Sequence, residues 1–172
     1  MNIKDLRIIF VGGIHGVGKT QFSTRTADDL NMTRLSASAL ITQQRNAPAA
    51  INKRVHNVAE NQGALIAAIE AQRIQSERIL LDGHFCVFDF DDRIQRIPVK
   101  TFQELAPVGV VVLFDEVATI QVALRKRDGR EFTTAVLKEL QKNELEHAEQ
   151  ICESLEIPLH VCRPTEYAGA RK

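Results

Sequence analysis

Residues 13 to 20, Gly-Ile-His-Gly-Val-Gly-Lys-Thr, constrain the fold of this chain more than any other stretch. They fit the pattern G-x-x-x-x-G-K-[ST], in which a glycine-rich loop surrounds a phosphate chain with backbone N–H groups. The apolar run from Ile8 to Val11 predicts a buried strand before the loop, and residues 20–30 predict a helix after it. Because this order is the one in which the pattern binds phosphate, a chance glycine-rich turn is the weaker interpretation, and we expect a nucleotide site.

The residue types in this loop each have a physical reason. Gly13, Gly16 and Gly18 permit a backbone that curls too tightly for side chains. The loop leads into the N-terminus of a helix, where anions are favoured. Lys19 is expected to reach the β- and γ-phosphates, and the Thr20 hydroxyl is expected to bind Mg²⁺.

Length and composition set further limits. The chain has 172 residues, so we expect one domain over residues 1–172, and its 44% hydrophobic content is sufficient for a core. Its 22 basic and 22 acidic residues cancel, which argues against nucleic acid or an anionic membrane as a partner. The longest apolar run, Val108 to Phe114, is too short to span a bilayer, and the N-terminus has no apolar signal segment. Three cysteines without C-x-x-C spacing indicate free thiols, no structural zinc site and a cytoplasmic location.

Strand and helix patterns alternate along the chain. The predicted strands are residues 6–11, 33–35, 79–82, 108–114 and 157–161. The predicted helices are residues 20–30, 37–45, 49–73, 116–127 and 133–155, while residues 83–100 are expected to form a mixed loop. The alternation predicts an α/β fold with a five-stranded parallel sheet, helices on both faces, and ligands at the carboxyl ends of the strands.

The helix predicted over residues 49–73 carries an apolar stripe in which Gln62 is the one polar residue. One interpretation is a partly buried amide whose hydrogen bonds are satisfied within the protein. The other interpretation is an amide that faces a substrate base.

Two predicted strands end in acidic residues. Asp82 follows one apolar run, and Asp115 with Glu116 follows another. We favour Asp82 as the carboxylate near the metal, because the segment after Asp115 predicts a helix that Asp115 can cap. The alternative is that the Asp115–Glu116 pair is similar to the acidic pair of ATP-hydrolysing machines, in which the glutamate activates water.

A basic cluster lies at the end of that helix, formed by Arg125, Lys126, Arg127 and Arg130. Phosphoryl transfer is catalysed mainly by charge stabilisation and positioning, so mobile arginines above the phosphates would serve it. Residues 125–132 are therefore predicted to form a short lid. The alternative is a solvated basic run that complements the helix dipole.

With these features the chain resembles the nucleoside monophosphate kinases, and among them the archaeal-type and nuclear adenylate kinase group. The shared features are the phosphate loop, the strand ending in Asp82-Gly83-His84, the loop over residues 83–100 and the arginines between 125 and 130. The resemblance implies a P-loop NTPase three-layer sandwich, in which residues 36–75 and 83–100 form the acceptor side.

The resemblance also implies roles for individual residues. The catalytic residues would be Lys19, Asp82, His84, Arg127 and Arg130. ATP would be bound by Gly13, Ile14, His15, Gly16, Val17, Gly18, Lys19, Thr20, Gln21, Arg125, Arg163 and Pro164, with Thr165 beside the adenine. Mg²⁺ would be held by Thr20, and by Asp82 through water. The candidates for acceptor binding are Ser36, Arg45, Arg54 and Gln62.

The activity that follows is phosphate transfer from Mg-ATP to a nucleoside monophosphate, with ATP and AMP giving two ADP. Such an acceptor needs no general base, because the second pKa of a phosphate ester is about 6. Two alternatives stay open. One is a small-metabolite kinase with a hydroxyl acceptor, for which Asp82 or His84 would be the base. The other is a small ATPase that serves as a regulatory or assembly switch. We expect nucleotide substrates and a monomer or homodimer, with or without a protein partner.

Overall fold

The computed structural model describes residues 3–45, 58–72, 76–89, 91, 93–128 and 131–166. Five strands form one parallel sheet in the order β2-β3-β1-β6-β7. These strands are β1 (Arg7–Gly12), β2 (Thr33–Ser36), β3 (Arg78–Asp82), β6 (Gly109–Leu113) and β7 (Leu159–Cys162). The predicted five-stranded parallel sheet is confirmed, and the carboxyl ends of its strands lie at one edge.

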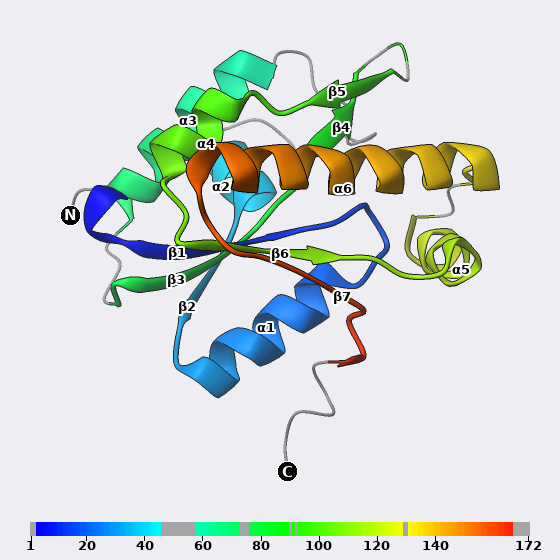
Figure 1. The fold of residues 1–172 in the computed structure, drawn as a ribbon, viewed down its shortest axis with the longest axis horizontal. Helices are drawn as coiled ribbons and strands as arrows, with labels where there is room; N and C mark the ends of the chain where they lie inside the picture. The colour runs from blue at the N-terminus through cyan, green and yellow to red at the C-terminus, as the bar shows by residue number, and fades with distance from the viewer. Residues whose placement is uncertain are drawn as a thin grey trace.

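Helices cover both faces of the sheet, as predicted (Figure 1). The chain begins with a short 3₁₀ turn, η1 (Ile3–Asp5). One face of the sheet carries α2 (Ala37–Arg45), α3 (Val58–Ala71), α4 (Val99–Leu105) and α6 (Thr134–Leu155). The other face carries α1 (Lys19–Leu30), and α5 (Val117–Asp128) lies beyond the carboxyl edge. Alternate strand residues therefore enter two cores: Ile8 and Phe10 pack in one, and Val11 packs in the other.

The segment after β3 differs from the prediction of a mixed loop over residues 83–100. It contains an antiparallel hairpin of β4 (Cys86–Phe88) and β5 (Ile94–Arg96), followed by the start of α4. The Asp89 carboxylate closes the turn, because Oδ1 accepts hydrogen bonds from the N–H groups of Asp91 and Arg93, both at 2.9 Å. Arg96 then joins the hairpin to α6 through Asn143, Glu146 and Gln150. Strands of three residues are too short to give a periodic signal in the sequence.

The helix predicted over residues 49–73 is described only as α3, and residues 46–57 lie outside the described part of the chain. Leu65 and Ile69 are buried, as expected for the apolar stripe, and Gln62 is half-buried beside them. The other predicted helices begin and end within one residue of the observed bounds, which reflects their clear periodicity and end signals.

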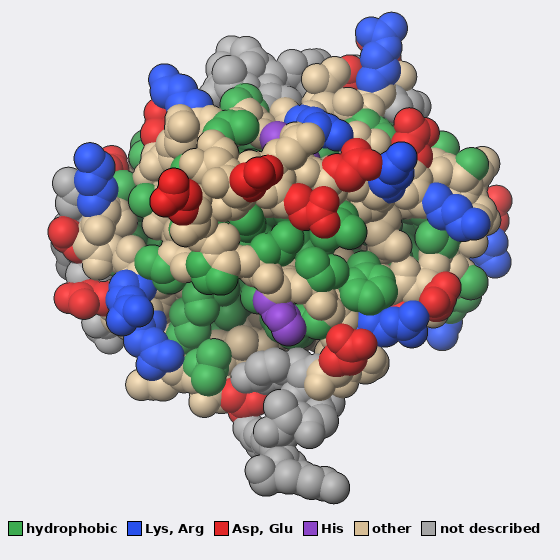
Figure 2. Space-filling model, viewed as in Figure 1, with side chains coloured by type: hydrophobic (Ala, Val, Ile, Leu, Met, Phe, Trp, Pro, Cys, Tyr) green, Lys and Arg blue, Asp and Glu red, His purple; other side chains and the backbone are tan. Residues whose placement is uncertain are grey.

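Acidic and basic side chains are intermixed on the face of the molecule that Figure 2 shows, in keeping with the balanced charge of the chain. Among the helices of the described residues, none is both long and apolar enough to cross a bilayer.

Candidate functional site

The loop between β1 and α1 has the conformation that its glycines predict. Gly13, Gly16 and Gly18 have φ angles of 137°, 84° and 100°, a region that side chains disfavour. A Cβ on Gly13 would lie 2.7 Å from the carbonyl oxygen of Leu113, so close packing also requires glycine there. Gly18 is the N-cap of α1, and the N-terminus of this helix therefore opens at the loop. This geometry fits a phosphate chain.

Lys19 lies across the loop to which it belongs. Its ammonium donates to the carbonyl oxygens of Gly13 and, at 3.0 Å, of Ile14. Thr20 and Gln21 are exposed in the first turn of α1. The expected contact of Lys19 with phosphates stays a prediction, and it requires the ammonium to exchange carbonyl oxygens for phosphate oxygens.

Two other segments that were predicted to reach the nucleotide lie against this loop. A Cβ on Gly18 would be 3.4 Å from Pro164, which follows β7, and a Cβ on Gly16 would be 2.7 Å from Leu124 of α5. Arg163, beside Pro164, pairs with Glu116 at 2.9 Å and lies over the Phe114 ring at 5.7 Å. The loop is therefore flanked by the predicted adenine side and by the helix that carries the basic cluster.

Three residues of the basic cluster lie in the last turn of α5. Arg125, Lys126 and Arg127 are all exposed there, and Arg125 pairs with Glu131 at 3.4 Å. Arg130 lies outside the described residues. Because the preceding residue, Leu124, packs on the loop, the cluster begins next to the phosphate site. Both sequence interpretations, a lid and a solvated helix end, are compatible with this position.

Asp82 lies at the carboxyl end of β3, next to the end of β1. Its side chain is buried and pairs with the Arg34 guanidinium of β2 at 2.5 Å. Ser36 is opposite Asp82 in the register, and its hydroxyl lies 3.2 Å from the Ser38 hydroxyl. The sequence did not single out Arg34, which balances the charge of the predicted metal-side carboxylate.

The side chains of the two histidines in the predicted site lie next to each other. The His15 and His84 rings have centroids 4.0 Å apart, although they come from loops after different strands. His84 Nδ1 also lies 3.8 Å from Glu144 Oε1. Among the described residues, the structure has no group of three or more His, Cys, Asp or Glu side chains suited to a metal ion.

Glu144 is a site residue that the sequence reasoning missed. It projects from α6 with 1% of its surface exposed, and its carboxylate accepts hydrogen bonds from the N–H groups of Gly13, Phe85 and Cys86. Burial raises the pKa of this carboxyl, while Lys19 and the three N–H groups act to lower it. The sequence feature that indicates Glu144 is its position between Leu140 and Ala148, where it is the one acidic residue in the apolar stripe of the helix.

The alternative acidic pair has other partners. Asp115 Oδ1 accepts from the Glu116 N–H at 2.8 Å, and Gln141 bonds both the N–H and the carbonyl of Asp115. The helix begins at Val117, so Asp115 lies one position before its expected capping place. Glu116 is exposed and paired with Arg163.

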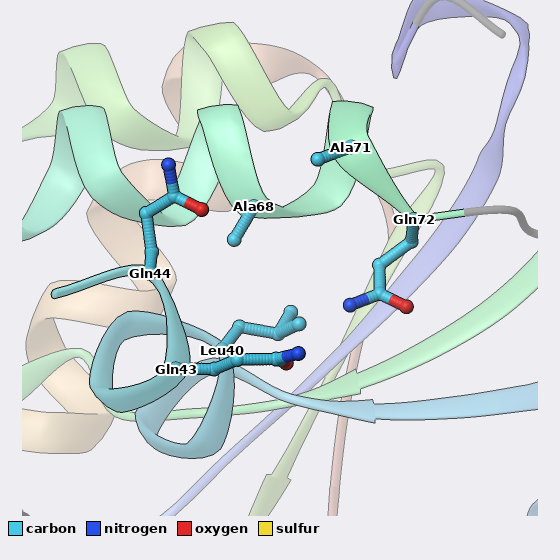
Figure 3. Close-up of a pocket in the computed structure, with 6 residues that line it drawn as sticks. All are labelled: Leu40, Gln43, Gln44, Ala68, Ala71 and Gln72. Atoms are coloured by element: carbon cyan, nitrogen blue, oxygen red, sulfur yellow. The ribbon is translucent and has the colours of Figure 1, made fainter. Parts of the chain in front are cut away.

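A cavity of about 490 Å³ lies between α2 and α3, within the predicted acceptor side. Figure 3 shows its lining of three glutamines and three apolar side chains: Leu40, Gln43, Gln44, Ala68, Ala71 and Gln72. The predicted acceptor residues Ser36 and Gln62 are not part of this lining. Arg45 ends α2 and its side chain lies outside the description, as does the whole of Arg54.

The comparison with family models agrees with the P-loop assignment. A family model described as an AAA domain matches residues 12–141, which include the phosphate loop, Asp82, His84 and the basic turn of α5. A solved gluconokinase from Sinorhizobium meliloti 1021 is similar at 14% sequence identity, covering 87% of this chain and 95% of that chain with a TM-score of 0.45. No match was found among curated proteins.

Proposed function

We propose that this chain, which belongs to the AAA domain family of P-loop proteins, transfers the γ-phosphate of ATP to a nucleoside monophosphate. With AMP as the acceptor, the products would be two molecules of ADP. The observation that carries the proposal is the complete phosphate loop, with Lys19 on it and with Asp82 and His84 on the neighbouring strand end. A nucleotide bound in this loop would have its terminal phosphate at the shared carboxyl edge of β1 and β3.

The residues around the loop supply what phosphoryl transfer needs. The N–H groups of the loop and the N-terminus of α1 would hold the phosphates, and Lys19 would turn from the loop carbonyls to them. Arg125 and Arg127 would add positive charge from α5. Mg²⁺ would neutralise phosphate charge, held by Thr20 and by Asp82. Because Arg34 already balances Asp82, a contact of Asp82 through water fits better than direct ligation.

A second candidate is a kinase with a hydroxyl acceptor, and one observation favours it. His84 lies 3.8 Å from the buried Glu144 carboxylate, an arrangement that can orient an imidazole as a general base. A hydroxyl needs such a base, whereas a phosphate acceptor does not. In an ATPase switch Glu116 would activate water. Its pairing with Arg163 at 2.9 Å gives no comparable support to that role.

ATP turnover tests the proposal directly. We expect ADP formation to rise roughly tenfold or more when AMP or another nucleoside monophosphate is added, because the acceptor completes the site. Small polyhydroxyl substrates form the comparison set, and the Lys19→Ala variant is the inactive control. A rate that does not depend on any monophosphate contradicts the proposal. Stimulation by an alcohol alone, lost in Asp82→Asn or His84→Gln, would favour the second candidate.

A further inference from the structure

The Glu144 carboxylate connects two loops that are far apart in the sequence. Oε1 accepts from the N–H groups of Gly13 at 2.9 Å and Phe85 at 3.0 Å, and Oε2 accepts from Cys86 at 2.6 Å. Gly13 begins the phosphate loop after β1, while Phe85 and Cys86 follow β3, the neighbouring strand. One side chain of α6 therefore bridges the nucleotide side and the His84 side of the site.

Gly13 is held at both of its polar atoms. Its N–H donates to Glu144, and its carbonyl oxygen accepts from the Lys19 ammonium. When Lys19 moves to the phosphates of a nucleotide, the carbonyl loses that contact. The bond to Glu144 would then keep the start of the loop in place.

The other end of the bridge is densely packed. The Phe85 ring is fully buried, stacked on Phe102 with centroids 5.0 Å apart and edge-on to Phe10 at 5.0 Å. The Phe85 carbonyl accepts from the Ile97 N–H at 2.8 Å, which fixes the backbone after His84. The centroid of the His84 ring lies 4.0 Å from that of His15, so the two loops also contact each other through these rings.

An apolar residue at position 144 would fit the stripe of α6 but would leave three buried N–H groups without this acceptor. A buried carboxylate is costly unless such donors satisfy it, and here they do so on both oxygens. The Lys19 charge favours its ionised form as well. The carboxylate therefore fixes backbone positions that hydrophobic packing would not fix.

We propose that Glu144 is the positioning residue of this site, which holds the phosphate loop in alignment with the His84 segment through Gly13, Phe85 and Cys86. The effect of Glu144 on catalysis rests on the proposed phosphotransferase function. Its effect on the coupling of the two loops requires only that the protein binds ATP, and not that it transfers phosphate. Glu144 itself touches neither phosphate nor acceptor, and it acts through the backbone of the two loops.

Glu144→Gln is the informative change, because it keeps the volume of the side chain and replaces one acceptor oxygen by a donor. Whichever way the amide turns, at least one of the three backbone N–H groups faces an NH₂ group. We expect ATP affinity to stay within about threefold, since the loop keeps its own N–H groups, while kcat falls on the order of tenfold through lost alignment. Glu144→Asp keeps the charge and the acceptors, and it should recover part of kcat.

The coupling is measured without turnover by the amide NMR resonances. In the wild-type protein, added ATP should shift the Phe85 and Cys86 resonances together with those of Gly16 and Gly18. In Glu144→Gln the shifts of Gly16 and Gly18 should persist, and those of Phe85 and Cys86 should shrink. Glu149→Gln, which removes an exposed charge from the same helix, is the matched control and should behave as wild type.

Several results would overturn the positioning role. One is a Glu144→Gln variant with unchanged kcat and unchanged Phe85 and Cys86 shifts. Another is a loss of kcat that only follows the unfolded fraction measured by circular dichroism. If Glu144→Gln does not fold, Glu144→Asp serves instead, and it must lower kcat while ATP affinity is retained. A wild-type protein that binds ATP but phosphorylates no acceptor contradicts the proposed function, and the amide shifts still test the coupling.

Discussion

Lys19 shows how a single residue of the site serves two states of the loop. In the structure its ammonium bonds to the carbonyl oxygens of Gly13 and Ile14, so it stabilises the curled backbone of the loop. Phosphate oxygens are stronger acceptors than carbonyls, because the hydrogen bond is then assisted by charge on both partners. The same side chain can therefore support the loop without a nucleotide and bind the nucleotide when it arrives.

Lys19→Ala removes the ammonium that is expected to bind the phosphates. A hydrogen bond to a charged partner contributes about 1.5–3 kcal/mol, so ATP affinity measured by calorimetry should fall roughly tenfold or more. Lys138→Ala, which removes an exposed lysine from α6, is the matched control and should bind ATP as wild type does. Equal affinities in the two variants would mean that the loop is a structural turn.

At the scale of elements, α6 organises the carboxyl edge of the sheet. Along its 22 residues, Gln141 holds the backbone of Asp115 after β6, and Glu144 holds the loops after β1 and β3. One turn later, the buried His147 Nε2 bonds the Ile97 carbonyl after the hairpin at 2.6 Å. The loops of the site thus share one helix as their support.

The first turn of α6 is capped by a side chain. Thr133 is its N-cap, and the Thr133 hydroxyl accepts from the Val136 N–H at 3.3 Å. Thr133→Ala should lower the free energy of unfolding by about 1 kcal/mol, because this N–H loses its partner. Urea denaturation measures the change, and Thr134→Ala, at the first helical position, is the control. A stability equal to that of the control would exclude the capping role.

Between them, the two cores of the protein bury all three cysteines. Burial raises the pKa of Cys152 to about 11, and burial together with the Glu144 charge raises the pKa of Cys86 to about 12. In the unfolded chain a thiol ionises near the ordinary value of 9.0. The folded state therefore binds more protons between these values. The stability that these thiols contribute is fully present below pH 9 and is lost as the pH rises toward 12.

We expect the free energy of unfolding to decline above pH 9, in part because the Cys86 thiol ionises more readily in the unfolded chain. At pH 10 the contribution of the Cys86 thiol to the free energy of unfolding should be smaller by about 1 kcal/mol than at pH 8. Thermal unfolding of wild type and Cys86→Ala over this range measures the contribution, because the other titrating groups are common to both proteins. Parallel pH profiles for the two proteins would show that the Cys86 thiol does not titrate differently on folding.

Much of the fold could be predicted because its signals are local. The strand and helix patterns depend on residues a few positions apart, and the bounds of α1, α2, α5 and α6 agree closely with them. The hairpin of β4 and β5 was missed, because two strands of three residues have no periodicity and depend on Asp89 and on anchoring to α6. Arg34 was missed as well, because nothing in a strand of four residues indicates an ion pair across to the next strand.

The phosphate loop follows from local residues, because its glycines, Lys19 and Thr20 set the backbone conformation within eight positions. The distant groups that complete the site come together only when the chain packs. Glu144 lies 131 residues from Gly13, and His84 reaches His15 from the neighbouring strand. Such contacts depend on how α6 and the strand ends pack together. Packing brings together residues that are far apart in the chain, and no local sequence pattern predicts those contacts.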